Sequence, residues 1–170
     1  MTGPATDSLQ PGDSIPDTDH VTHYCRPIVY PDGQFTAAAF LPRAAEPYLS
    51  LNWIEFFRAA EDPIECIRCA LGKKLGLSSS GCIAQFNVGE AKRAFQRMNV
   101  ISGVDAARAR PALSITYEPE LEEPQDLSHA GARPSSNQPR HSELNERMAA
   151  AIRSVVSQRY PSRHPSSTPM

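Results

Sequence analysis

The chain lacks long apolar stretches. No run of about 18 apolar residues exists among its 170 residues, which excludes a membrane-spanning helix in the sequence. Its first residues, MTGPATDSLQPGD, have neither the basic region nor the apolar region of a secretory signal. We therefore expect a cytoplasmic protein with no membrane partner. Its thiols are then expected to be reduced, and they are Cys25, Cys66, Cys69 and Cys82.

Charge of one sign is missing from several stretches. No Lys or Arg precedes Arg26, and none lies among the five acids from Glu118 to Asp126. The 16 prolines, about twice the usual frequency, concentrate outside the middle of the chain. Such stretches are typical of solvated, mobile segments. They predict a disordered leader over 1–19, an acidic, proline-rich linker over 118–141 and a disordered tail over 161–170.

Residues 21–41 predict a β-hairpin. Val21 to Tyr30 are rich in residues that favour an extended backbone, although Pro27 requires an edge position or a bend. Pro31-Asp32-Gly33 favours a turn, because proline presets one dihedral and glycine accepts a positive φ. Phe35 to Leu41 would then form the returning strand.

The centre of the chain alternates between strand and helix patterns. Asp62 followed by Pro63 predicts a helix start, and Ile64, Ile67 and Leu71 share one face of that helix. The other expected elements are strands at 48–53, 82–88 and 112–117 and helices at 54–60 and 89–98.

These elements indicate a small α+β (mixed α/β) domain over 20–117, a sheet with two or three packed helices. A tethered amphipathic helix is expected over 142–160, and its apolar stripe consists of Leu144, Met148, Ile152, Val155 and Val156. It can fold back on its own domain, which we expect, or dock into the groove of a partner.

Cys66 and Cys69 have the spacing of a zinc ligand pair or a dithiol redox site. Zinc needs two further ligands, and the chain has no second CxxC pair. Both cysteines also lie inside a predicted helix, where cysteine serves as a small core residue. We therefore predict no metal site and no cofactor, and a zinc-stabilised binding domain is our third hypothesis.

The stretch HVTHYCR, residues 20–26, concentrates polar side chains at the predicted first strand. His20-Val-Thr22 matches one half of the motif pair of two-histidine phosphoesterases, but the chain has no second half. Strand alternation places His23 and Cys25 on one face and Tyr24 and Arg26 on the other. We interpret the stretch first as the start of a fold and second as a site.

An enzyme acting on a nucleotide, NAD or a phosphodiester is our second hypothesis. Arg26 offers a planar fork for phosphate and His23 a titratable donor, with Glu55 and His129 as further catalytic candidates. Candidate binding residues are His20, Tyr24, Asn52, Asn87 and Ser128. Asn87 ends a strand where a helix begins, and a helix N-terminus attracts anions.

Charge balance bears on the partner. Residues 26–110 contain 11 basic and 8 acidic residues, so this region has no clear basic excess and nucleic-acid binding is not favoured. Few catalytic residue types pair up, and a tethered helix can dock. Our first hypothesis is therefore an accessory protein that acts by contact with a protein partner, whose identity the sequence does not give.

Six stretches together resemble a group of short bacterial proteins without an assigned activity. They are HVTHYCRP (20–27), DG (32–33), AFLPR (39–43), YLSLNWIE (48–55), FNVGEAK (86–92) and SHAG (128–131). The resemblance implies that these segments form one unit and that Ser128 and His129 belong with the folded domain. It implies no activity, cofactor or catalytic residue.

Overall fold

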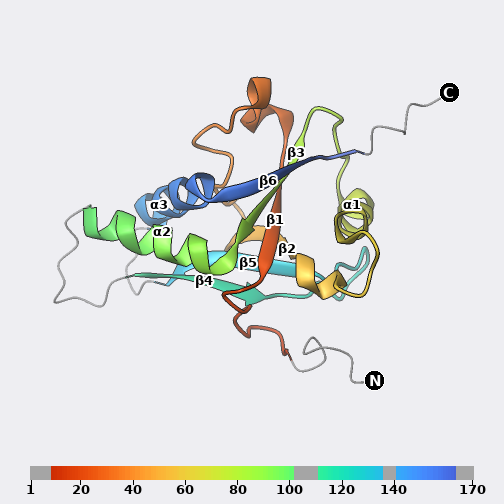
Figure 1. Cartoon of the computed structure of the whole chain (residues 1–170), viewed down its shortest axis with the longest axis horizontal. Coiled ribbons are helices and arrows are strands. Elements are labelled where there is room, and N and C mark those ends of the chain that lie inside the picture. Colours follow the sequence, from red (N-terminus) through yellow and green to blue (C-terminus); the bar gives the residue numbers. More distant parts are fainter. Residues whose placement is uncertain (1–8, 102–110, 136–140, 164–170) are drawn as a thin grey trace.

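The computed structural model describes residues 9–101, 111–135 and 141–163 (Figure 1). The fold is α+β, as predicted. Six strands form one antiparallel sheet in the order β4-β5-β2-β1-β3-β6. The strands are β1 (His20–Cys25), β2 (Leu49–Trp53), β3 (Cys82–Asn87), β4 (Ala112–Tyr117), β5 (His129–Ser135) and β6 (Val156–Pro161). The α-helices are α1 (Pro63–Lys74), α2 (Val88–Ile101) and α3 (His141–Ser154), and 3-10 turns cover Pro27–Val29, Pro31–Gly33 and Ile54–Phe57.

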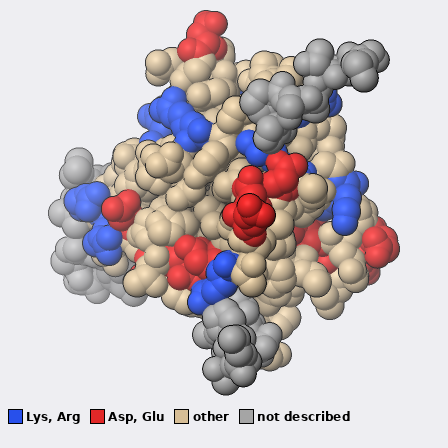
Figure 2. Space-filling model, turned by 45° about the vertical axis from the view of Figure 1, so that its right-hand side comes forward, with Lys and Arg blue, Asp and Glu red and all other residues tan. Residues whose placement is uncertain are grey.

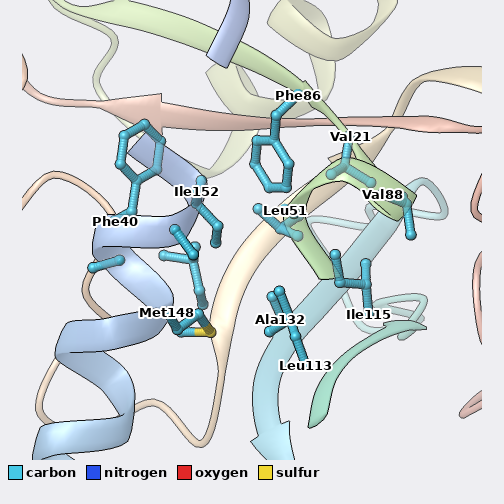
Figure 3. Close-up of a cluster of buried hydrophobic side chains, with 14 of the residues drawn as sticks. Val21, Phe40, Leu51, Phe86, Val88, Leu113, Ile115, Ala132, Met148 and Ile152 are labelled. Atoms are coloured by element: carbon cyan, nitrogen blue, oxygen red, sulfur yellow. The ribbon is translucent and has the colours of Figure 1, made fainter. Parts of the chain in front are cut away.

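One face of the sheet carries the larger apolar core. Helices α2 and α3 lie side by side over this face (Figure 1). Alternate strand residues point towards them, so Val21, Leu51 and Phe86 join one buried cluster with Met148 and Ile152 of α3 (Figure 3). The stripe predicted for the terminal helix is therefore buried in the domain's own core.

Helix α1 covers part of the opposite face. Asp62 caps it by accepting a hydrogen bond from the Glu65 N–H, with Pro63 at the first position, as predicted. Its Ile64, Ile67 and Leu71 pack on Ile83 in a second, smaller cluster. None of the helices within the described residues is long and apolar enough to cross a membrane.

The predicted hairpin is wrong. Strand β1 ends at Cys25, and Pro27 and Pro31 each begin a 3-10 turn. Asp32 has a left-handed backbone with φ of 53°, and residues 35–41 form no strand. Since proline lacks the N–H of a strand ladder, the two prolines end β1, which pairs instead with β2 and β3.

Part of the predicted leader is ordered. Ile15 is 1% exposed in the main core, and Ser14 forms a bridge with Thr116 of β4. Residues 12–15 exchange backbone hydrogen bonds with Ile115 and Tyr117. Polar composition concealed this segment because its backbone, rather than its side chains, makes these bonds. Residues 1–8 lie outside the described part.

The predicted linker and terminal helix also differ from the structure. Residues 129–135 form β5, which lies between β4 and β2, and residues 136–140 lie outside the described part. Helix α3 ends at Ser154, and Val156–Pro161 form β6 on the edge of the sheet. Val155 and Val156 were predicted in the helical stripe, but β-branched residues suit a strand equally well.

Candidate functional site

A cavity of about 230 Å³ opens where β1 and β2 separate. The two strands pair only at Val21–Trp53 and Thr22–Asn52. Beyond these pairs the side chain of His23 joins the two strands, since its Nδ1 lies 2.8 Å from the carbonyl oxygen of Ser50. The lining comes from β1, β2, α1, β5 and two loops, and its polar members are His23, Tyr24, Arg26, Arg43, Glu46, Ser50, Asn52, Lys74, Glu120 and His129.

His23 is a wall of this cavity. Its ring lies 5.6 Å from that of Phe40, centre to centre. Burial lowers the pKa of His23, and the carbonyls of Ser50 and Ala39 only partly oppose this effect. The imidazole is therefore neutral at pH 7 and donates from Nδ1 to Ser50, which fixes its orientation.

His129 contributes a ring nitrogen that has no hydrogen bond. The residue is 2% exposed, and its Nδ1 lies 2.8 Å from the carbonyl oxygen of Glu118, to which it donates. Its Nε2 is buried without a hydrogen bond, 3.4 Å from Oε1 of Glu120. A buried polar atom without a partner is rare in proteins and marks a place where a ligand or water can bind.

Lys74, at the C-terminal end of α1, joins two carboxylates beside His129. Its Nζ lies 2.8 Å from Oε2 of Glu120 and 2.9 Å from Oδ2 of Asp126. Burial disfavours the charged form of both Lys74 and Asp126, but their hydrogen bonds outweigh it. The pKa of Lys74 is raised and that of Asp126 is lowered, so both are ionised at pH 7.

Asp126 is fixed by polar groups of β2 and of the turn that precedes β5. Asn52 Nδ2 donates to Asp126 Oδ2 and to Ser128 Oγ, each at 2.8 Å. Ser128 Oγ donates to Asp126 Oδ1 at 2.7 Å. Since the side chain of Asp126 is fully buried, these contacts and Lys74 replace its lost hydration. Ser128 thus helps to hold Asp126 in place, and it does not line the cavity.

Seven of the nine candidate residues divide into two groups. His23, Arg26, Asn52 and His129 line the cavity together with Tyr24, whose hydroxyl also accepts a hydrogen bond from the Ser78 N–H. His20 and Glu55 form a separate pair at the other end of β1, with Nδ1 of His20 2.8 Å from Oε1 of Glu55. The predicted set of His23, Arg26, Glu55 and His129 is therefore not one cluster.

Asn87 has a local role. Its Oδ1 accepts a hydrogen bond from the Glu90 N–H at 2.9 Å, as an N-cap of α2 does. The N–H groups of Val88 and Gly89 donate to the carbonyls of Asp19 and Asp17. This helix N-terminus is thus satisfied by the chain itself, and Asn87 lies outside the cavity.

The four cysteines lie apart from this site. Cys66 and Cys69 are on α1, where Cys69 is exposed, whereas Cys25 and Cys82 are buried partners across β1 and β3. Burial raises the pKa of both Cys25 and Cys82, which makes them poor nucleophiles. Among residues 9–101, 111–135 and 141–163, no group of three His, Cys, Asp or Glu side chains is placed to hold a metal ion.

Sequence reasoning missed Lys74, Glu120 and Arg43. Lys74 counted only towards local basicity, and Glu120 lay in a stretch taken for a linker. The isolated pairing of Glu120 with Asp126, through two backbone hydrogen bonds, orders that stretch. The sequence did contain one signal of a site in this stretch, the Ser-His pair at 128–129, because it places a histidine close to Glu120 and Asp126.

No protein-family model, curated protein or solved structure matches the chain. A function for the chain is therefore inferred from the geometry of the cavity.

Proposed function

We propose that the protein binds a small anionic molecule, a phosphate ester or a mononucleotide, in the cavity between β1 and β2, and that His129 performs acid–base chemistry on it. The observation that carries this proposal is the buried Nε2 of His129, which has no hydrogen bond and belongs to a side chain lining the cavity. Nδ1 is fixed on the Glu118 carbonyl, so Nε2 is the nitrogen that can exchange a proton with a ligand.

The charges around the cavity support an anionic ligand. Three cationic side chains line it (Arg26, Arg43 and Lys74), against the carboxylates of Glu46 and Glu120. Arginine binds phosphate through paired N–H groups, and lysine adds a point charge. The asparagine and tyrosine of the lining supply neutral hydrogen bonds that can fix the orientation of a sugar or base.

The size of the cavity restricts the ligand. A volume of about 230 Å³ lies below the usual range of ligand pockets in proteins, about 300–1,000 Å³. It suits a compact phosphate ester or a mononucleotide better than a dinucleotide such as NAD. Basic and acidic side chains are interspersed on the face seen in Figure 2, so this face offers no continuous basic surface to a long nucleic acid.

Binding and turnover test the proposal together. Inorganic phosphate, ribose 5-phosphate, AMP and NAD are titrated into the protein by calorimetry, and ³¹P NMR follows product formation. We expect a phosphate ester or mononucleotide to bind and to be converted. In His129→Asn conversion is lost while the fold survives, since the Asn amide can still donate towards the Glu118 carbonyl.

The matched control is His20→Asn, because His20 lies outside the cavity, paired with Glu55. This variant should keep both binding and conversion. If none of the four compounds binds to the wild-type protein, the proposal fails.

The protein-partner hypothesis has lost its structural motive. It rested on the scarcity of paired catalytic residue types and on a tethered amphipathic helix that could dock, and the apolar side of α3 is buried against α2 and the sheet. It stays a prediction, which recovery of a stable partner at native expression levels would test.

A further inference from the structure

Glu120 lies beside His129 and lines two cavities. One carboxylate oxygen lies 2.8 Å from Lys74 Nζ and the other 3.4 Å from His129 Nε2. Glu120 and Lys74 also line a second, more open cavity of about 520 Å³, formed with residues 121–124. The carboxylate therefore lies between the inner cavity and the open one, and it faces the two groups that an anionic ligand would meet.

Of the two carboxylates that contact Lys74, only that of Glu120 can move away from it. The side chain of Asp126 is fully buried and held by Asn52 and Ser128, whereas that of Glu120 is 39% exposed. The backbone of Glu120 is fixed by two hydrogen bonds with Asp126. Its side chain can thus rotate towards the solvent while the loop keeps its place.

We propose, as an inference that rests on the proposed function, that the carboxylate of Glu120 occupies the position of the ligand's anionic group. The ligand then replaces Glu120 as the partner of Lys74 and His129. One oxygen of a monoprotonated phosphate group accepts a hydrogen bond from Lys74 Nζ, its P–OH group donates to Nε2 of His129, and Glu120 turns into the open cavity. No covalent bond changes in this exchange.

Charge balance favours exchange over simple addition. Lys74 stays paired with Asp126 throughout, and an incoming anion replaces a carboxylate rather than joining it. The site therefore never holds three anionic groups around one ammonium. The exchange also gives Nε2 of His129 the hydrogen bond that it lacks.

Removal of the Glu120 side chain should therefore tighten phosphate binding. In Glu120→Ala we expect the affinity for inorganic phosphate, measured by calorimetry, to rise about tenfold or more, because the anion no longer competes with a charge-assisted hydrogen bond. The matched control is Glu46→Ala, which removes a carboxylate from the same cavity lining. We expect at most about a twofold gain there, from the general change in potential.

A second variant tests the contact with lysine. Adding Lys74→Met to Glu120→Ala should abolish the gain in affinity. In wild-type protein labelled with ¹³C, phosphate should shift the carboxylate signal of Glu120, which a purely structural role of that residue would leave unchanged.

The outcomes separate the two proposals. If wild-type protein binds phosphate but Glu120→Ala gains no more than Glu46→Ala, the replacement of Glu120 is refuted and the proposed function stands. If neither the wild type nor Glu120→Ala binds phosphate or any of the phosphate esters, both proposals fail.

Discussion

The two faces of the sheet have opposite chemistry. Towards α2 and α3 the strands present apolar side chains, and Val21, Leu51 and Phe86 are at most 1% exposed. On the other face, β1, β2 and β5 align Thr22, Asn52 and His129 in one row through their pairing. The first face supplies free energy of folding by burying apolar area. The second buries polar groups at a cost, which is typical of a functional site.

The comparison extends to the helices. Helices α2 and α3 cover their face with apolar residues, whereas α1 covers its face with Ile64, Ile67 and Leu71 and then ends at Lys74. The apolar part of α1 fixes the helix, and its charged end enters the polar cluster. A single helix thus joins the packing of the fold to the chemistry of the cavity.

The largest effect should come from the apolar face. Phe86→Ala removes a fully buried ring and leaves a cavity under α2 and α3, so we expect a loss of roughly 3–5 kcal/mol in the free energy of unfolding. Urea denaturation followed by circular dichroism measures it. A loss below about 1 kcal/mol would show that this face does not hold the main core.

The polar face should respond more weakly, and its response should depend on pH. Lys74→Met leaves the buried carboxylate of Asp126 without its cation, which we expect to cost about 3 kcal/mol at pH 7. The pKa of Asp126 is lowered in the folded wild type, so its stabilising contribution is present above pH ~4 and is lost as the pH falls through the folded pKa.

The variant has lost this contribution already. The difference in unfolding free energy between wild type and Lys74→Met should therefore shrink from pH 7 to pH ~3, measured by urea denaturation at each pH. A difference that stays constant over this range would contradict the ionic role of the pair. Arg68→Met is a control on the same helix, since Arg68 pairs with an exposed Glu65.

The smallest effect is expected at a residue that the sequence offered as a binding group. Asn87→Ala removes the N-cap of α2 and should cost about 1 kcal/mol of stability. Phosphate affinity should stay at the wild-type value, because Asn87 lies outside the cavity. Weaker phosphate binding, measured by calorimetry, would place Asn87 in the site after all.

Local signals predicted the central elements. The Asp62-Pro63 cap and the alternation at 48–53 lie within single elements, so the sequence alone predicts them. The strands β5 and β6 escaped prediction for a different reason. Strand β5 contains Gly131 and Pro134, and its Gly131 is required because a Cβ there would lie 2.7 Å from the Tyr48 ring. Such a contact depends on Tyr48, which is 83 residues away in sequence, and it leaves no local pattern.

The site was predicted only in part, again because some of its residues meet only through tertiary structure. His23 and Arg26 were chosen for chemistry that a strand start displays, and both line the cavity. Glu55 was chosen as an available acid, but the chain turns after β2 and brings it to His20. Glu120 and Lys74 meet only through tertiary structure, since 46 residues separate them.

The strand order has a consequence for synthesis on the ribosome. Strand β2 needs β5 as its neighbour, and β3 needs β6, so partners are made roughly 80 residues apart. Until residue 161 has left the exit tunnel, β3 has an unpaired edge and the cavity lacks the wall that His129 supplies only late. Folding of the sheet should thus wait for its last strands and be slow, because non-local pairing must close long loops first. Nascent chains should meanwhile depend on chaperones to cover those edges.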